Sequence, residues 1–311
     1  MPSLANFLDW CLAIYGNEAA FPIGISKFIK DISCNTPICA ILPLDEELRR
    51  VCDKIKRSVP VKEFPSDMEL LQRKCPALFG IFSSLSDSFA PAEFIPLLTD
   101  LLNIADNAFK DCEAPQDDSV VNPSSLLANF PSLKPVRGRG TYAADKGKQT
   151  FENPCTKKSG RHPTLLPGIF LIFCQHGINY GYSVMTTNES PDMPFTILRS
   201  RFTRAPRVVV YDNACNLHSY CLNRDPAFFK DTQFLVDRLH WADHTGCSSA
   251  YHISCYPDYD YLNSQIAEQS NSGLKKIKGP LSYMNDENFS RHCSFYLWFK
   301  NREIMMRNIN R

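Results

Sequence analysis

The sequence predicts an α/β protein, α+β overall, in which a helical N-terminal region precedes a domain built on a mixed sheet. Three observations support this fold class. Apolar residues recur at helical spacing over residues 1–112, Pro, Gly, Ser and Lys are frequent in residues 113–167, and strand-like runs begin at residue 168. We therefore divide the chain into a helical region (1–112), a loop-rich basic linker (113–167) and an α/β domain (168–311).

The N-terminal region carries apolar residues with helical periodicity in three segments, 4–15, 45–59 and 91–112. Prolines separate the periodic segments, which is typical of helix boundaries. We expect three helices here, each with one apolar face. On the second helix that face comprises Leu48, Val51, Cys52 and Ile55.

Residues 113–167 differ in composition from the segments on either side. Runs such as EAPQDDSVVNPSS are typical of loops and linkers. This is also the most basic part of the chain. We interpret it as a solvated linker, and the alternative is a strip that contacts phosphates. The cationic residues are Lys134, Arg137, Arg139, Lys146, Lys148, Lys157, Lys158 and Arg161.

The α/β domain begins with two strand-like runs, GIFLIFC (168–174) and INYGYSVM (178–185), which we expect to form a hairpin. The run RVVVYD (207–212) is continuously apolar, which is typical of a strand in the middle of a sheet covered on both faces. Residues 232–241 predict a further strand. Helices are expected over residues 224–230, 262–277 and 285–307.

Composition and charge exclude several classes of protein. The net charge of +1 gives no global electrostatic argument for binding nucleic acid or membranes. No basic region precedes the N-terminal apolar run, which Asp9 interrupts, so we expect no secretory signal. No apolar stretch reaches the roughly 18 residues that a membrane span needs. Thirteen cysteines without a signal indicate an intracellular, reducing location, where a disulfide framework is not expected.

Soft metal ligands gather in the stretch that follows residue 212. Cys215 and His218 lie three residues apart, and His240, His244 and Cys247 form a second cluster. Tetrahedral zinc takes four Cys or His ligands, commonly as two close pairs, so we predict a structural Zn²⁺ here. The alternatives are buried cysteines with hydrogen-bonded histidines, or Cys215 and His240 as a nucleophile and base. Cys155, Cys174 and His176 are spare ligand candidates.

Carboxylates define a second candidate site. Asp212 follows the apolar strand directly, and strand ends are where scaffolds hold reactive groups. Two-metal phosphoryl transfer needs several carboxylates that converge from different elements. Glu268, on the predicted helix 262–277, is the obvious partner, although periodicity alone favours a solvated face for it. The only candidate for an earlier acid is Asp145.

Four blocks of the C-terminal half occur in the same order in a known family. They are PGIFLIFCQHGINYGYSVM, the stretch ending in RVVVYDNACNLHSYC, FLVDRLHWADHTGC and NSQIAEQSNSGL. Over residues 135–301 the chain resembles the Kyakuja–Dileera–Zisupton (KDZ) transposases, and the similarity is closest to the transposase-like region of vertebrate HMG-box-containing relatives. The YDNAC, HWxxH and NSQxxEQ blocks are specific only in combination.

This resemblance implies a ribonuclease-H-like fold and DDE-type chemistry, in which Mg²⁺ ions held by three acids drive cleavage or strand transfer of DNA. It makes Asp212 the second acid and Glu268 the third, and it leaves Asp145 as the candidate for the first. It also implies DNA as a partner and a nuclear location. Because the first acid lacks strand-like surroundings, we expect a domesticated or truncated derivative. The alternative function is a catalytically silent, zinc-stabilised module that binds nucleic acid or, through the helical N-terminal region, protein.

Overall fold

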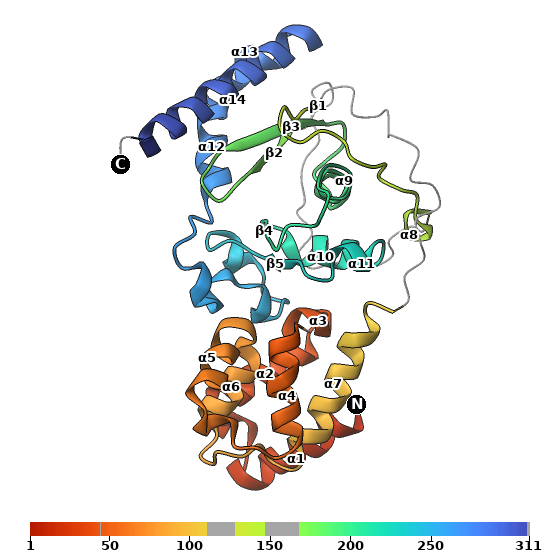
Figure 1. Cartoon of the computed structure of the whole chain (residues 1–311), viewed down its shortest axis with the longest axis vertical. Helices are drawn as coiled ribbons and strands as arrows, with labels where there is room; N and C mark the ends of the chain where they lie inside the picture. Colours follow the sequence, from red (N-terminus) through yellow and green to blue (C-terminus); the bar gives the residue numbers. More distant parts are fainter. Residues whose placement is uncertain (44, 111–127, 147–167, 310–311) are drawn as a thin grey trace. The chain divides into compact units, whose positions relative to one another are not determined.

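The structure is a computed structural model that describes residues 1–43, 45–110, 128–146 and 168–309. Helices and strands both occur, and the N-terminal region is helical, as predicted (Figure 1). A ribonuclease-H-like arrangement stays a prediction. No helix in the described part of the chain combines the length and the apolar character that a bilayer span requires.

The chain forms two compact units, each described here by itself. Unit 1 contains Met1–Glu113 and Arg207–Tyr261, and unit 2 contains Ala114–Pro206 and Leu262–Arg311. Residues 207–261 therefore fold together with the N-terminal helices. The domain boundaries proposed from the sequence stay predictions.

The N-terminal helices of unit 1 enclose one apolar core. The predicted helix 45–59 is confirmed as α4, whose apolar face is buried and whose N-terminus is capped by Asp45, since its carboxylate accepts the Leu48 N–H at 2.8 Å. The core continues into residues 207–261 through Ala250. The helices are α1 (Pro2–Tyr15), α2 (Ile23–Ser33), α3 (Ile38–Ile41), α4 (Glu46–Lys56), α5 (Pro65–Lys74), α6 (Pro76–Ser84) and α7 (Phe94–Asn107).

Helices α2 and α6 cross at two glycines. A Cβ atom on Gly24 would lie 1.9 Å from the carbonyl oxygen of Gly80, so only glycine allows this approach. The Gly24 N–H donates to the Ser84 hydroxyl at 3.1 Å, and that hydroxyl donates to the Gly80 carbonyl at 2.7 Å. The crossing is therefore held by backbone contact and by hydrogen bonds.

The remainder of unit 1 contains a parallel strand pair, β4 (Val208–Val210) and β5 (Gln233–Leu235), with Val209 opposite Phe234. The helices α10 (Ala214–Leu222) and α11 (Pro226–Phe229) connect these strands. The prediction that β4 lies in the middle of a sheet covered on both faces is wrong. Among the described strands β4 pairs with β5 alone, and Val210 is 36% exposed.

The predicted strand 232–241 is also too long. The strand ends at Leu235, and a 3₁₀ helix, η3, begins at His240. Asp237 causes the change, because its carboxylate accepts the backbone N–H groups of Leu239 (2.8 Å) and His240 (3.1 Å) and so turns the chain. Three further 3₁₀ helices follow, η4 (Ser249–Tyr251), η5 (Ile253–Cys255) and η6 (Pro257–Tyr259).

Unit 2 is built on a three-stranded antiparallel sheet in the order β1-β3-β2. The predicted hairpin is confirmed, with Ile169 opposite Val184 and Leu171 opposite Tyr182. Its turn uses Gly177 at a φ of 81°, which glycine adopts without strain. The strands are β1 (Ala128–Asn129), β2 (Gly168–Phe173) and β3 (Asn179–Met185).

Helices pack on this sheet and enclose a small apolar core around Tyr182, Leu274, Cys293 and Leu297. The predicted helices 262–277 and 285–307 are confirmed as α12 and α14, whereas α9 was not predicted. The helices of this unit are α8 (Ala143–Lys146), α9 (Asp192–Arg201), α12 (Ile266–Lys275), α13 (Lys278–Ser282) and α14 (Asp286–Ile309).

The glycine crossing leads to the first prediction. Gly24→Ala should lower the free energy of unfolding by about 2 kcal/mol or more, because α2 and α6 must move apart to admit the methyl group. Gly279→Ala is the control, since nothing lies within 4 Å of a Cβ placed there. Calorimetry of both variants checks this, and equal melting temperatures for Gly24→Ala and the wild type would contradict the close crossing.

Candidate metal centre

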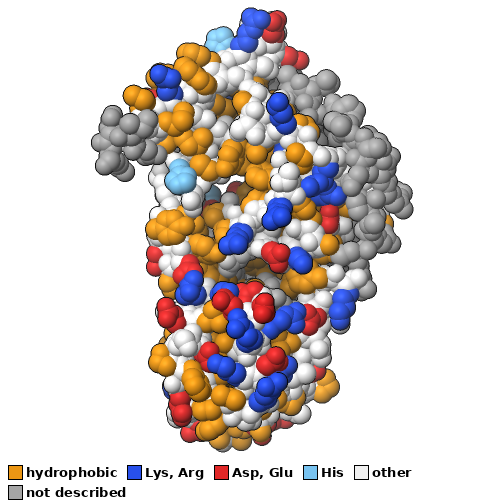
Figure 2. All heavy atoms as spheres, viewed as in Figure 1, with side chains coloured by type: hydrophobic (Ala, Val, Ile, Leu, Met, Phe, Trp, Pro, Cys, Tyr) orange, Lys and Arg blue, Asp and Glu red, His pale blue; other side chains and the backbone are white. Residues whose placement is uncertain are grey.

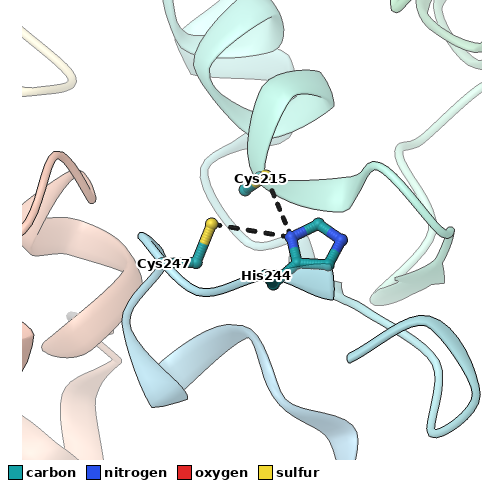
Figure 3. Close-up of side chains that lie close together, drawn as sticks. All are labelled: Cys215, His244 and Cys247. Atoms are coloured by element: carbon teal, nitrogen blue, oxygen red, sulfur yellow. Dashed lines mark hydrogen bonds between the residues drawn. The ribbon is translucent and has the colours of Figure 1, made fainter. Parts of the chain in front are cut away.

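Three predicted metal ligands lie together in unit 1: Cys215, His244 and Cys247 (Figure 3). Their ligand atoms all lie within 4.8 Å of one another. The His244 Nδ1 atom is 3.6 Å from the Cys215 Sγ and 3.6 Å from the Cys247 Sγ. Cys215 and His244 are buried, and Cys247 is partly exposed.

These distances agree with tetrahedral zinc. With Zn–S bonds of about 2.3 Å, Zn–N bonds of about 2.0–2.1 Å and a tetrahedral angle, a sulfur and a nitrogen on the same ion lie about 3.5–3.6 Å apart. Both S···N separations in the structure, at 3.6 Å, agree with this range. The three side chains therefore fit a zinc ion, and a fourth ligand would complete the tetrahedron.

The second nitrogen of His244 determines how the ring is used. Its Nε2 atom lies 2.8 Å from the backbone carbonyl oxygen of Asp212, and it donates a hydrogen bond to that oxygen. The proton therefore resides on Nε2, and the Nδ1 lone pair faces the two thiols. A histidine that donates its other N–H to a carbonyl is the usual arrangement of a metal ligand. The same bond joins the metal site to the end of β4.

The N-terminal helices position Cys247. The Ser248 N–H donates to the Thr36 hydroxyl at 3.0 Å. Asp31, on α2, accepts the Ser249 N–H at 2.9 Å and the Ser249 hydroxyl at 2.7 Å. Asp31 is only 3% exposed, so these bonds are shielded from water. Residues from the beginning of the chain thus hold a candidate ligand more than 200 positions later.

An aromatic stack limits the movement of the His244 ring. Trp241 lies parallel to His244, with ring centroids 6.0 Å apart, and parallel to His252, with centroids 4.5 Å apart. The indole therefore lies parallel to the ligand histidine and close to it, in an offset arrangement. A fixed ring orientation reduces the entropy lost when an ion binds.

A proton and a metal ion compete for His244. The hydrogen bond with Cys247 raises the pKa of His244, and the bond to the Asp212 carbonyl acts in the same direction, while burial opposes both. Because the ligand nitrogen must be deprotonated, metal affinity should fall on acidification.

The other two predicted ligands, His218 and His240, are not members of this group. The Nδ1 atom of His218 lies 3.0 Å from the Tyr251 hydroxyl, and its ring stacks on Phe234. His240 pairs with Asp237 at 2.7 Å. Both correspond to the structural alternative, a hydrogen-bonded histidine. Cys215 contacts His244 and not His240, so the suggested nucleophile and base are not paired.

The predicted carboxylates lie in different units. Asp212 is in unit 1, at the end of β4, while Asp145 and Glu268 are in unit 2. Glu268 lies half-buried in the first turn of α12. Asp145, on α8, forms an ion pair with Arg139 at 2.6 Å. The charge of Asp145 is thus balanced within unit 2, which disfavours a role as a magnesium ligand.

The basic linker is described only in part. Arg139 bridges Asp145 and Asp192, and Arg137 donates to the carbonyls of Arg199 and Phe202 near the end of α9. These two arginines therefore bind groups within unit 2. Lys148, Lys157, Lys158, Arg161 and the spare ligand candidate Cys155 lie outside the described residues. The other spare candidates, Cys174 and His176, lie 3.9 Å apart in unit 2.

Sequence reasoning missed the residues that support the ligands. Asp31, on α2, and Thr36, between α2 and α3, carry no chemical motif, and only the fold brings them to Ser248 and Ser249. The bond from His244 to the Asp212 carbonyl uses a backbone atom, which leaves no trace in the residue pattern. The one available signal was the HWxxH block, which places Trp241 three residues before His244.

Replacement of a ligand should remove the metal. We expect the wild type to bind about one zinc ion per chain, and Cys215→Ser and Cys247→Ser to lose it together with several kcal/mol of stability. Cys255→Ser, a cysteine of unit 1 outside the group, is the control. Metal analysis of the purified variants provides the measurement. A fully folded wild type without metal after supply of zinc would contradict the site.

His218 predicts a pH dependence of stability. Burial lowers its pKa from 6.5 to about 4. The unfolded chain therefore binds a proton at a pH where the folded chain does not, so stability is lost as the pH falls from about 6.5 to about 4, by roughly 3 kcal/mol in total. The wild type should lose its advantage over His218→Gln across this range in denaturant titrations. The exposed His292→Gln is the control, and parallel curves for wild type and His218→Gln would refute the assignment.

Comparison with known proteins agrees with the motifs. The family described as Kyakuja-Dileera-Zisupton transposase matches residues 145–301, about half of the chain. That match includes all three members of the candidate metal group, together with Asp212 and Glu268. No curated protein and no solved structure matches the chain. The likeness to HMG-box-containing relatives stays a prediction. The sequence and the family match show that the chain belongs to the Kyakuja-Dileera-Zisupton transposase family.

Proposed function

We propose that this transposase-derived protein binds nucleic acid and that a structural Zn²⁺ at Cys215, His244 and Cys247 stabilises its fold. The observation that carries the zinc site is the geometry of His244. Its Nδ1 atom lies at the tetrahedral-zinc separation from two thiols, while its Nε2–H is held by a carbonyl. Membership of a transposase family supports nucleic acid as the partner.

The zinc ion would connect three parts of unit 1. Cys215 lies in the first turn of α10, His244 directly follows η3 (His240–Asp243), and Cys247 precedes Ser249, which is bonded to Asp31 of α2. An ion bound by all three would cross-link the strand end to the N-terminal helices. This supports a scaffolding role for the helical region, in addition to the predicted role as a surface for a protein partner.

Magnesium-dependent cleavage of DNA is the second candidate function. It is favoured by the placement of Asp212, whose backbone carbonyl is tied to His244 at the end of a strand. This function would require both predicted acids, Asp212 and Glu268, and metal ions that activate water or a 3′-hydroxyl for attack on a phosphodiester. The ion pair of Asp145 with Arg139 argues against a complete set of three acids. A site with two acids would stabilise the transition state poorly.

These two functions can be separated by one set of assays. In gel-shift titrations the zinc-loaded wild type should bind duplex DNA, with an affinity that falls as salt rises. Cys247→Ser should bind at least 10-fold more weakly, because the scaffold loosens, whereas Cys255→Ser should bind normally. With supercoiled plasmid and Mg²⁺ or Mn²⁺ we expect no nicking.

Two results would change this conclusion. If the folded, zinc-loaded protein binds neither duplex nor single-stranded DNA at low salt, the proposed function is wrong. If it nicks plasmid and both Asp212→Ala and Glu268→Ala abolish nicking, the catalytic function replaces the binding function. Asp145→Asn should leave nicking unchanged in that case, because the Asp145 carboxylate forms an ion pair with Arg139 and is not expected to bind a metal ion.

A further inference from the structure

Helix α14 carries apolar side chains on both of its faces. One face packs against the sheet of unit 2, where Cys293 and Leu297 are buried and Phe289 and Tyr296 are partly buried. The backbone carbonyl of Ser290 also accepts a hydrogen bond from the Tyr182 hydroxyl at 3.3 Å. The inner face alone therefore accounts for the attachment of this helix, and the outer face is not needed for it.

The outer face exposes three large rings. Phe295 is 65% exposed, Trp298 55% and Phe299 46%. Their spacing of three and four residues places them on one side of the helix. Phe295 and Trp298 stack with centroids 6.0 Å apart. Figure 2 shows hydrophobic side chains, with Lys and Arg among them, at the surface where Figure 1 draws α14.

Cationic groups lie among these rings. The Arg302 guanidinium is 5.8 Å from the Trp298 ring, and the Lys300 ammonium is 5.9 Å from both the Phe299 and Tyr296 rings. Between residues 298 and 307 there are three cations and one carboxylate, Glu303, which pairs with Lys300 at 2.7 Å. No carboxylate of the described residues forms an ion pair with Arg302. The face is therefore both aromatic and positively charged.

A cavity of about 450 Å³ adjoins this face. It lies between the β2–β3 turn, α12 and α14, and its lining includes His176, Lys300 and Arg307. Gln269 and Asn301 add amide groups. Lys300 contacts Tyr296, which lines the cavity, and Phe299, which is exposed, so it stands at the border between the two. A single strand of nucleic acid that stacks its bases on the rings would thus place its phosphates against the cations and amides of the cavity.

We propose that the outer face of α14, comprising Phe295, Trp298, Phe299 and Arg302, binds single-stranded nucleic acid by stacking of bases on its rings. Exposed aromatic side chains interleaved with cations are how sequence-tolerant single-strand binding is achieved, because every base offers a π face. The net positive charge of residues 298–307 favours a polyanion as the partner. A second copy of the same face is disfavoured, because its cations would repel those of the first copy. This inference rests on the proposed nucleic-acid-binding function and identifies a surface for it.

The test is fluorescence anisotropy of a labelled oligothymidylate of about 20 nucleotides, titrated with the full chain. Trp298→Ala and Phe295→Ala should each weaken binding by about 5- to 100-fold, and Trp298→Phe should retain most of it. These positions are exposed, so the variants should fold normally. Phe89→Ala is the matched control, since Phe89 is a 50% exposed ring in unit 1.

Three results would overturn the inference. One is oligothymidylate binding by Trp298→Ala that equals the wild type. Another is a wild-type protein that binds duplex DNA but not the oligonucleotide, which leaves the proposed function intact. The third is a wild-type dimer in light scattering that Trp298→Ala converts to a monomer while oligonucleotide binding is unchanged, because the face would then be an interface between copies. Failure to bind either form of DNA would instead refute the proposed function itself.

Discussion

The buried carboxylate of Asp31 is the constraint on which the candidate metal centre depends. It accepts two hydrogen bonds from Ser249, so the segment that carries Cys247 lies against α2. Buried charge is costly unless hydrogen bonds satisfy it, and here the bonds come from a segment far along the chain. The need to satisfy Asp31 therefore couples the packing of the N-terminal helices to the position of a metal ligand. This coupling also explains why residues 207–261 share one compact unit with the helical region.

His244 extends this coupling from the helices to the strand. One ring nitrogen faces Cys215 and Cys247, and the other donates to the carbonyl of Asp212, two residues beyond β4. The strand pair is short and partly exposed, so its end would be weakly fixed by the sheet alone. A metal ion would add an attachment where sheet hydrogen bonds are few. The proposed zinc would thus be a structural element of unit 1.

Unit 2 uses its charges differently. Arg137 donates a hydrogen bond to a carbonyl of α9, and Arg139 forms an ion pair with Asp145. Two positive residues of the basic linker therefore bind polar groups within unit 2. Exposed cations also lie on α14, where Lys300 and Arg302 stand beside rings that no described element covers. A place in the basic segment therefore does not by itself make a residue a phosphate contact, since Arg137 and Arg139 bind groups of unit 2 instead. What matters is which cations the fold leaves without a partner, and whether groups that can stack on bases lie next to them.

Several features follow from the sequence by itself, because they depend on local periodicity and short spacing. Among these are α4 with its buried face, the β2–β3 hairpin, α12, α14, and the family to which the YDNAC, HWxxH and NSQxxEQ blocks belong. Five metal ligands could be proposed from spacing, but only the tertiary structure separated Cys215, His244 and Cys247 from His218 and His240. The reason is physical: a hydrogen bond to Tyr251 or Asp237 satisfies a histidine as well as a metal does, and the sequence does not show which partner lies within 3 Å. Likewise, the residue pattern of 285–307 predicts a helix. Only the packing in the tertiary structure decides which of the two apolar faces of α14 is covered.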